Sequence, residues 1–188
     1  MTTTLTEFIS TSFQNVRSRE RTDQLHKAVL FFLYDQRDAL LKYDVQFEYT
    51  MPDSYNGTFT VDIALLQDGV VKKVVLCKAL NSNINKNLKN LANTTVGETV
   101  RIVHADNEVD EIIFVTTAPE KAPVFTKDGV VTRIDDVLSA KKRTNITNVI
   151  KQVSNGKATL IDVWYQIPNI QSCDHRDQFQ HFNPVMVG

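Results

Sequence analysis

The sequence predicts an α/β fold in which a mixed sheet of about five strands is flanked by helices. Residues 22–42 carry apolar side chains at helical spacing, whereas residues 44–80 contain three segments patterned as strands. A further helix and a buried apolar strand at residues 111–117 follow, an alternation typical of α/β proteins. With 188 residues, 42% of them hydrophobic, the chain is expected to form a single domain, residues 1–188, with its own core.

The first strand follows directly after the helical segment. At residues 44–50, Val45, Phe47 and Tyr49 alternate with polar residues, so we expect these three side chains to share one face. The second and third strands are expected at residues 58–66 and 70–80. The Asp-Gly dipeptide between them is a strong signal for a hairpin.

The rest of the chain is punctuated by turn residues. An Asn-Ser-Asn cluster predicts the start of a helix. The stretch 118–123, which contains two prolines, is expected to interrupt the secondary structure. The later elements expected are a helix at 84–93, a short strand at 98–103, the strand at 111–117, helices at 133–141 and 145–154, and a strand at 159–165. The chain then divides into a core at 22–117, appended helices and a strand at 118–167, and an irregular tail at 168–188.

Composition narrows the class of protein. The 21 basic and 22 acidic residues leave a net charge of −1, so a nucleic-acid site must be a local patch. Cys77 and Cys173 cannot form a disulfide framework, and the first residues lack the basic and apolar regions of a signal peptide. Because the apolar runs fall far short of the roughly 20 residues that span a bilayer, we expect a cytoplasmic protein with no membrane partner.

Two charged residues lie in apolar strand segments. Asp62 stands between two apolar residues of the second strand, and Lys78 closes the third. Such charges are costly to bury unless they pair or bind an ion. A two-residue loop at Asp68–Gly69 would point Lys78 away from Asp62, whereas a three-residue loop starting at Gln67 would place both on one face. The sequence suits either loop.

This arrangement resembles the PD-(D/E)xK nuclease superfamily, the restriction-endonuclease-like proteins, whose core is helix, three strands, helix, strand. In that family an Asp on the second strand, and an acid two residues before a Lys on the third, hold Mg²⁺. The Lys orients the attacking water or stabilises charge at the phosphate. Asp62 matches the first acid and Lys78 the lysine, and residues 81–88 are similar to the polar helix entry of some members. The resemblance covers about residues 22–117.

The resemblance implies a metal-dependent nucleic-acid phosphodiesterase, an endonuclease-like hydrolase that uses Mg²⁺ or Mn²⁺ and favours DNA over RNA. The motif departs from the family at its second acid, because Leu76 occupies that position. A substitute carboxylate would come from Glu48 or Glu98, since Mg²⁺ beside a phosphate usually needs two hard oxygen ligands. Some restriction enzymes carry this acid on the following helix, but here Asn90 falls near that spacing and Glu98 lies well beyond it. The candidate catalytic residues are Asp62, Lys78 and Glu48, and the candidate metal ligands are Asp62, Glu48 and Glu98.

Other interpretations stay open beside the nuclease. Leu76 and the near-neutral charge favour a catalytically inactive member of the fold that binds nucleic acid or a protein partner, including a second copy of itself. A third hypothesis is an unrelated α/β interaction domain in which Asp62 and Lys78 form a structural pair. The alternative for Asp62 itself is a surface ion pair with Lys72 or Lys78, which would contribute little. Asp53, which follows Pro52, matches the letters of the motif but lies in a turn, so Asp62 is better placed.

The candidate nucleic-acid contacts are basic residues near two helix starts. Lys86 and Lys89 lie on the helix after the motif, where a nuclease would meet the phosphate backbone. Lys141, Lys142 and Arg143 precede a second helix, whose start favours anions. A solvated basic turn is the alternative for the second group.

The two cysteines receive different interpretations. Cys77 faces the side opposite to Lys78 and is expected to be a small core residue. Cys173 lies in the tail with other zinc-ligand types, His175, Asp177 and His181, but their spacing matches no standard zinc finger. A solvated polar tail is therefore expected, with a zinc site as the alternative.

Overall fold

The computed structural model describes residues 5, 8, 19–80, 84–126, 130–137, 140–166 and 185–187. In chain order the elements are α2 (Arg19–Gln36), the 3-10 helix η1 (Asp38–Lys42), β1 (Asp44–Pro52), β2 (Thr58–Gln67), β3 (Val70–Ala79), α3 (Ile84–Val103), β4 (Glu111–Pro119), β5 (Lys121–Phe125), β6 (Val131–Asp136), α4 (Ala140–Val153), β7 (Ala158–Gln166) and β8 (Val185–Val187). The predicted α/β class is confirmed.

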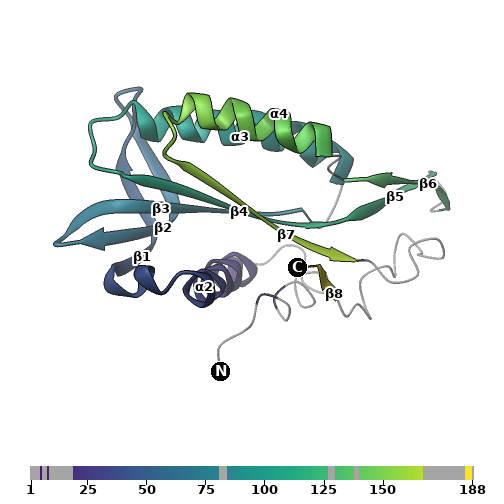
Figure 1. Ribbon diagram of the computed structural model, residues 1–188, viewed down its shortest axis with the longest axis horizontal. Helices are drawn as coiled ribbons and strands as arrows, with labels where there is room; N and C mark the ends of the chain where they lie inside the picture. Colours follow the sequence, from purple (N-terminus) through teal and green to yellow (C-terminus); the bar gives the residue numbers. More distant parts are fainter. Residues whose placement is uncertain are drawn as a thin grey trace.

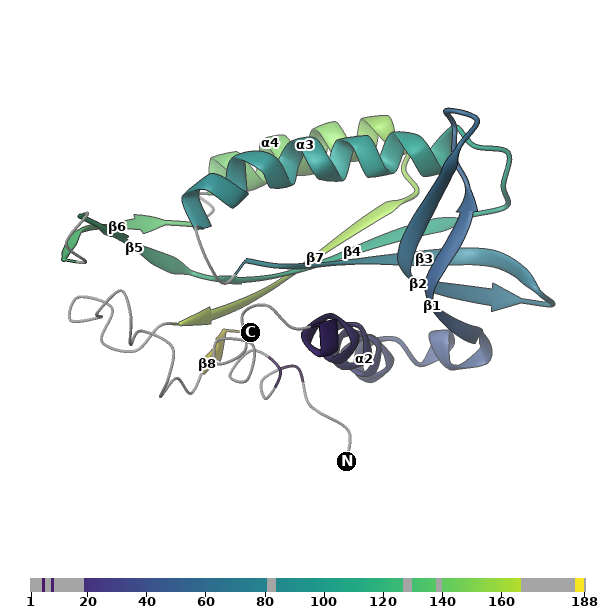
Figure 2. The same cartoon turned by 180° about the vertical axis from the view of Figure 1, so that it is seen from behind.

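The central layer is a six-stranded sheet in the order β1-β2-β3-β4-β7-β8, and β5 and β6 form a separate two-stranded sheet. β1, β2 and β3 are antiparallel neighbours, β3, β4 and β7 run parallel, and β8 is antiparallel to β7. Helix α2 covers one face of the large sheet, and α3 and α4 cover the other (Figures 1 and 2). The two crossover helices α3 and α4 therefore both begin at the end of the sheet where the parallel strands finish.

Two hydrophobic cores lie on the two faces of the sheet. The α2-side core packs α2 against the sheet and is built from residues such as Leu33, Ile63 and Val75. The α3/α4-side core packs both other helices against the sheet and includes Leu76 and Ile150. Because residues 74–77 of β3 and residues 112–115 of β4 are buried on both faces, these segments are continuously apolar, as expected for parallel strands.

The β2–β3 hairpin has the two-residue loop. Gln67 pairs with Val70, and Asp68 and Gly69 both have positive φ, 54° and 79°, which suits the right-handed twist of the strands. With this loop we expected Asp62 to lie opposite Val75, but the register also shifts between Leu65 and Leu66, so Ile63 takes that place. This β-bulge adds one residue to β3 relative to β2.

The predicted alternation of β1 is interrupted at Glu48, whose φ is +50°. Val45 packs against the α2-side core, whereas Tyr49 packs against the α3/α4-side core, and Phe47 is 40% exposed. The expectation that these three residues share one face is therefore wrong. The positive φ turns the strand over, so its two halves contact different layers.

Two segments take a different secondary structure from the one predicted. Residues 98–103, expected as a strand, continue α3, and the Thr95 and Thr99 hydroxyls donate to carbonyls one helical turn back, both at 2.7 Å. Within residues 133–141, expected as a helix, residues 133–136 instead belong to β6, which pairs with β5, whereas Ala140 and Lys141 begin α4. At 98–103 the tertiary environment overruled the β-branched composition, and at 133–136 strand pairing overruled the helical pattern.

Several boundaries also differ. The helix expected at residues 22–42 ends at Gln36, and the backbone at Arg37 is non-helical before η1 begins. The break expected at 118–123 is short, since β4 ends at Pro119 and β5 starts at Lys121. In the tail, β8 pairs with the last three residues of β7, so that part of the chain is not irregular.

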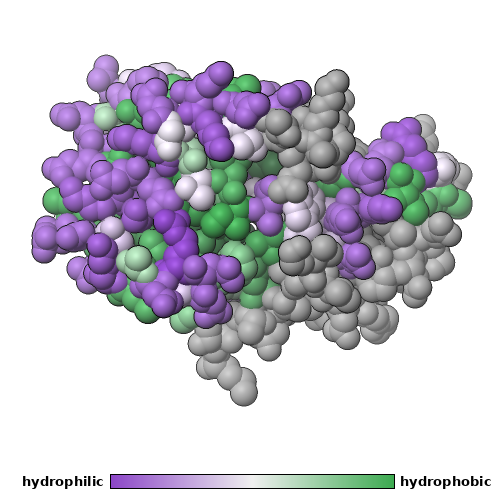
Figure 3. Space-filling view, viewed as in Figure 1, coloured by the Kyte–Doolittle hydropathy of each residue, from purple (hydrophilic) through white to green (hydrophobic). Residues whose placement is uncertain are grey.

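Among the described residues, β8 pairs with only the last part of the outer edge of β7. β8 pairs with Trp164, Tyr165 and Gln166, while Leu160 and Ile161 are half-buried. Figure 3 shows hydrophilic residues over most of the described part of this face and hydrophobic residues gathered near its middle, where β7 crosses in Figure 1.

Candidate functional site

Asp62 lies where β2 separates from β3. The ladder between the two strands runs only as far as Ile63 opposite Val75, and the β1–β2 hairpin then rises toward the α3/α4 layer (Figures 1 and 2). The Cys77 N–H donates to Asp62 Oδ2 at 2.6 Å. The carboxylate thus accepts a backbone donor beyond the last ladder pair, and its side chain remains 23% exposed.

Lys78 pairs with Glu98 rather than with Asp62. Its Nζ lies 2.7 Å from Glu98 Oε1, which reaches the sheet from α3, and no ion pair joins Lys78 to Asp62 among the described residues. The Glu98 side chain is 13% exposed, and its Oε2 is buried without a hydrogen-bond partner in the described part of the chain. Because α3 extends through residues 98–103, Glu98 reaches a position that its sequence spacing did not suggest.

The environment of Glu98 disfavours its charge. Burial raises the pKa of this carboxyl, the hydrogen bond and charge of Lys78 lower it, and the nearby negative charge of Asp62 raises it again. The net effect is a raised pKa. A second cation beside the two carboxylates would relieve both the desolvation and the repulsion.

Glu48 points to the other side of Asp62, toward α2. Its Oε1 lies 3.1 Å from Nδ1 of His26, and Nε2 of that imidazole lies 3.6 Å from Asp62 Oδ1. The His26 side chain is 3% exposed, whereas that of Glu48 is 52% exposed. The candidate acid on β1 thus contacts a histidine that the sequence interpretation did not select.

Cys77 is in the core, as predicted, but it is close to two polar side chains. A ring nitrogen of His26, a carboxylate oxygen of Asp62 and the Cys77 sulfur all lie within 4.8 Å of one another. Burial, followed by the negative charge of Asp62, raises the pKa of the Cys77 thiol well above its ordinary value. In the sequence, His26 stands between Leu25 and Lys27 with no motif around it, and only the distant partners on β2 and β3 give it a site.

Two other residues at positions of the motif, Leu76 and Asp53, have structural roles. Leu76, at the position of the family's second acid, is 1% exposed in the α3/α4-side core. Asp53 accepts hydrogen bonds at 2.9 Å from the N–H groups of Tyr55 and Gly57, so it stabilises the β1–β2 turn. Asp62 is therefore the acidic residue of the motif that reaches the polar group.

The basic candidates lie near the starts of the two crossover helices. Lys86 and Lys89 fall in the first two turns of α3, and Lys141, Lys142 and Arg143 fall in the first turn of α4. Both helices begin at the same end of the sheet, because β3, β4 and β7 are parallel.

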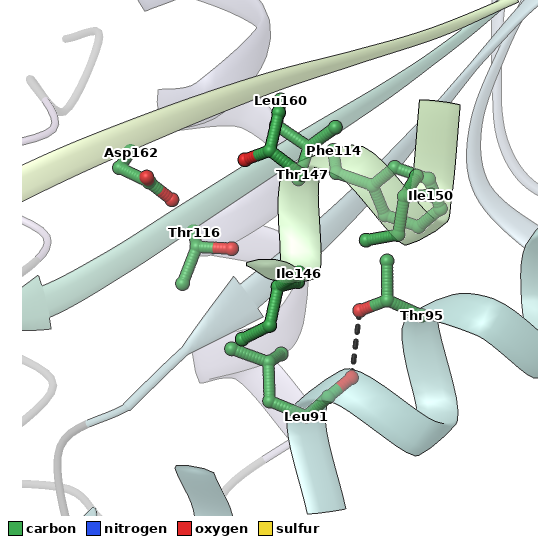
Figure 4. Close-up of a pocket in the computed structure, with 9 residues that line it drawn as sticks. All are labelled: Leu91, Thr95, Phe114, Thr116, Ile146, Thr147, Ile150, Leu160 and Asp162. Atoms are coloured by element: carbon green, nitrogen blue, oxygen red, sulfur yellow. Dashed lines mark hydrogen bonds between the residues drawn. The ribbon is translucent and has the colours of Figure 1, made fainter. Parts of the chain in front are cut away.

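The tail candidates Cys173, His175, Asp177 and His181 lie outside the described residues. Between α3, α4 and the sheet there is a cavity of about 30 Å³, lined mostly by apolar side chains, with Thr116 and Asp162 at its sheet side (Figure 4). A space of this size accommodates water.

No protein-family model, curated protein or solved structure matches this chain. In the part of the chain that the structure describes, no helix is both long enough and apolar enough to cross a membrane. The chemistry of the Asp62 group therefore follows from its own residues and geometry.

Proposed function

We propose that this protein is a metal-dependent nucleic-acid phosphodiesterase with a restriction-endonuclease-like core. The order of α2, three antiparallel strands, α3 and β4 supports such a core, because it is helix, three strands, helix, strand. The observation that carries the proposal is the approach of Glu98 from α3 to Lys78, next to Asp62. Glu98 supplies the second carboxylate that Leu76 cannot.

The donor set fits Mg²⁺ or Mn²⁺. Asp62 and Glu98 offer hard carboxylate oxygens, and the buried Glu98 Oε2 has no other partner among the described residues. When bound by these carboxylates, the metal would polarise the phosphate and make a bound water more acidic. Asp62 is held in place by the Cys77 N–H, so its carboxylate is oriented before any ligand arrives.

Lys78 has two roles in this proposal. Its ammonium favours the charged form of the buried Glu98, since removing that partner would leave burial and the charge of Asp62, which raise the pKa of the carboxyl, opposed only by the charge of Arg101. The Lys78 side chain is also 24% exposed, so it can donate a hydrogen bond to a phosphate oxygen and stabilise charge there. Lys86, Lys89, Lys141, Lys142 and Arg143 would bind the phosphate backbone, and we favour DNA over RNA as the substrate.

The test is cleavage of plasmid DNA and single-stranded RNA with Mg²⁺ or Mn²⁺. We expect Asp62→Asn, Lys78→Ala and Glu98→Gln each to reduce cleavage at least 100-fold, in the range seen when a group stabilising transition-state charge is removed. Glu108→Gln is the matched control, because Glu108 is an exposed carboxylate paired with Lys72. We expect this variant to cleave like the parent protein. Circular dichroism establishes that each variant is folded.

Glu48→Gln decides which carboxylate completes the site. Full activity in Glu48→Gln together with loss in Glu98→Gln supports the proposal, and the reverse result contradicts it. A parent protein that cuts neither substrate with either metal also contradicts it. The buried Leu76 favours the second candidate in that case, an inactive member of the fold, which fluorescence anisotropy with labelled DNA would detect as binding without cleavage.

A further inference from the structure

His26 is buried between two carboxylates on the α2 side of the sheet. Its Nδ1 has no hydrogen-bond partner among the described residues, although Glu48 Oε1 lies only 3.1 Å away. On the opposite side of the ring, Nε2 lies 3.6 Å from Asp62 Oδ1, beyond hydrogen-bonding distance. A buried polar ring placed in this way needs a charge partner.

Glu48 lies beside Nδ1 of His26, so Nε2 is the ring nitrogen that faces Asp62. A cation placed between Nε2 and Oδ1 would contact both residues. A carboxylate next to the far nitrogen of a metal-binding histidine is a common arrangement, because it fixes the tautomer and the ring orientation. Glu48 would have this orienting role here.

Cys77 supplies a third donor at the same place. One ligand atom each from His26, Asp62 and Cys77 lies within 4.8 Å of the others. Tetrahedral zinc, with bonds of about 2.0–2.3 Å, separates its ligands by roughly 3.3–3.7 Å. The 3.6 Å between Nε2 and Oδ1 already fits, and the sulfur needs to approach by no more than about 1 Å.

We propose that His26, Asp62 and Cys77 form a binding site for a borderline divalent transition metal of the zinc class. The set combines a nitrogen, an oxygen and a sulfur ligand, which suits Zn²⁺ or Co²⁺ and does not suit Mg²⁺. Three protein ligands leave a fourth position for water. Binding releases the thiol proton of Cys77 to solvent as the metal–sulfur bond forms.

This site is distinct from the proposed magnesium site and does not depend on nuclease activity. It lies toward α2, whereas Glu98 approaches Asp62 from α3, on the other face of the sheet. Asp62 belongs to both, so a zinc-class ion at His26 would compete for the carboxylate that the hydrolytic site needs. Zinc would then inhibit cleavage, but its binding is measurable without any cleavage assay.

The experiment is a titration of the metal-free full chain with Co²⁺, followed by absorption spectroscopy. We expect one equivalent to produce a thiolate-to-cobalt charge-transfer band in the near ultraviolet, which Zn²⁺ displaces and excess Mg²⁺ does not. In Cys77→Ser the band should disappear. In His26→Gln we expect cobalt affinity to fall at least 10-fold, because losing a ligand costs at least as much as losing the group that orients it.

The controls separate this site from the tail and from the hydrolytic site. Cys173→Ser must keep the band, since the tail contains other zinc-ligand types, and Glu98→Gln must also keep it. The proposal is overturned if the parent gives no band, if Cys173→Ser loses it, or if Cys77→Ser retains it. Should Cys77→Ser fail to fold by circular dichroism, His26→Gln decides, and undiminished cobalt affinity in the folded His26→Gln variant overturns the site.

Discussion

Replacing Glu111 with glutamine is expected to destabilise the protein by about 2 kcal/mol at neutral pH. Glu111 begins β4 and receives three side chains from other elements. Arg37 donates to both its oxygens at 2.8 and 3.0 Å, Lys73 donates at 2.7 Å and the Thr159 hydroxyl at 2.8 Å. The carboxylate therefore connects the end of α2 to β3, β4 and β7.

The magnitude follows from the pKa of Glu111. Burial alone would raise it, but the hydrogen bonds from Arg37, Lys73 and Thr159 outweigh burial and lower it from 4.5 to about 2. This difference corresponds to about 3 kcal/mol at 1.36 kcal/mol per unit. Because the Arg37 side chain is 33% exposed, solvent screens part of the interaction, which reduces the expected value to about 2 kcal/mol.

The sign gives a second test. A carboxyl whose pKa is lower in the folded state contributes stability above pH 4.5, and the contribution is lost as pH falls toward about 2. Urea unfolding should therefore show a parent protein that loses stability over this interval and a Glu111→Gln variant that loses about 2 kcal/mol less. Equal stability of the two proteins at pH 7, or an unchanged difference at pH 2.5, would refute the electrostatic account.

Two further predictions concern the hairpin and the basic residues. Gly69→Ala should lower the free energy of unfolding by about 1 kcal/mol, because Gly69 has φ +79° and only its backbone conformation, not its surroundings, opposes a side chain. Gly97→Ala inside α3 should raise the free energy of unfolding by about the same amount. Thermal unfolding of both variants gives the two signs, and equal signs would contradict this prediction. Replacing Lys141, Lys142 and Arg143 with alanine should make DNA binding less sensitive to salt. The slope of the logarithm of the binding constant against the logarithm of the salt concentration, measured by fluorescence anisotropy, should decrease in magnitude by about 0.9 per lost phosphate contact. Exposed Lys27, on α2, is the control, and an unchanged slope in the triple variant would exclude the α4 start as a contact.

The sequence predicted the parts of the fold in which local pattern and tertiary environment agree. A two-residue hairpin turn requires positive φ at both of its residues, and Asp68 and Gly69 adopt it readily. The hairpin was therefore predictable from the turn residues alone. The bulge between Leu65 and Leu66 has no such signature. It shifts the pairing of β2 with β3 by one residue, so that Ile63 and not Asp62 lies opposite Val75.

The candidate site was only partly predictable for the same reason. Asp62 and Lys78 stand out because they are charged within apolar segments, and this pattern is visible in one dimension. Glu98 was one of two candidates for the second acid, but its place was not predictable, since residues 98–103 were expected to form a strand and instead lengthen α3. His26 gave no signal of its own, because its partners Glu48 and Asp62 lie on strands far along the chain.

The position of Asp62 at the strand fork would let one carboxylate belong to both proposed metal sites. On the α3 side its charge acts on Glu98, and on the α2 side its carboxylate lies near the nitrogen of His26 and the sulfur of Cys77. Asp62→Asn should therefore remove both magnesium-dependent cleavage and cobalt binding, Glu98→Gln only the first, and Cys77→Ser the second. Because a zinc-class ion would occupy the shared carboxylate, we expect zinc and magnesium to compete for Asp62.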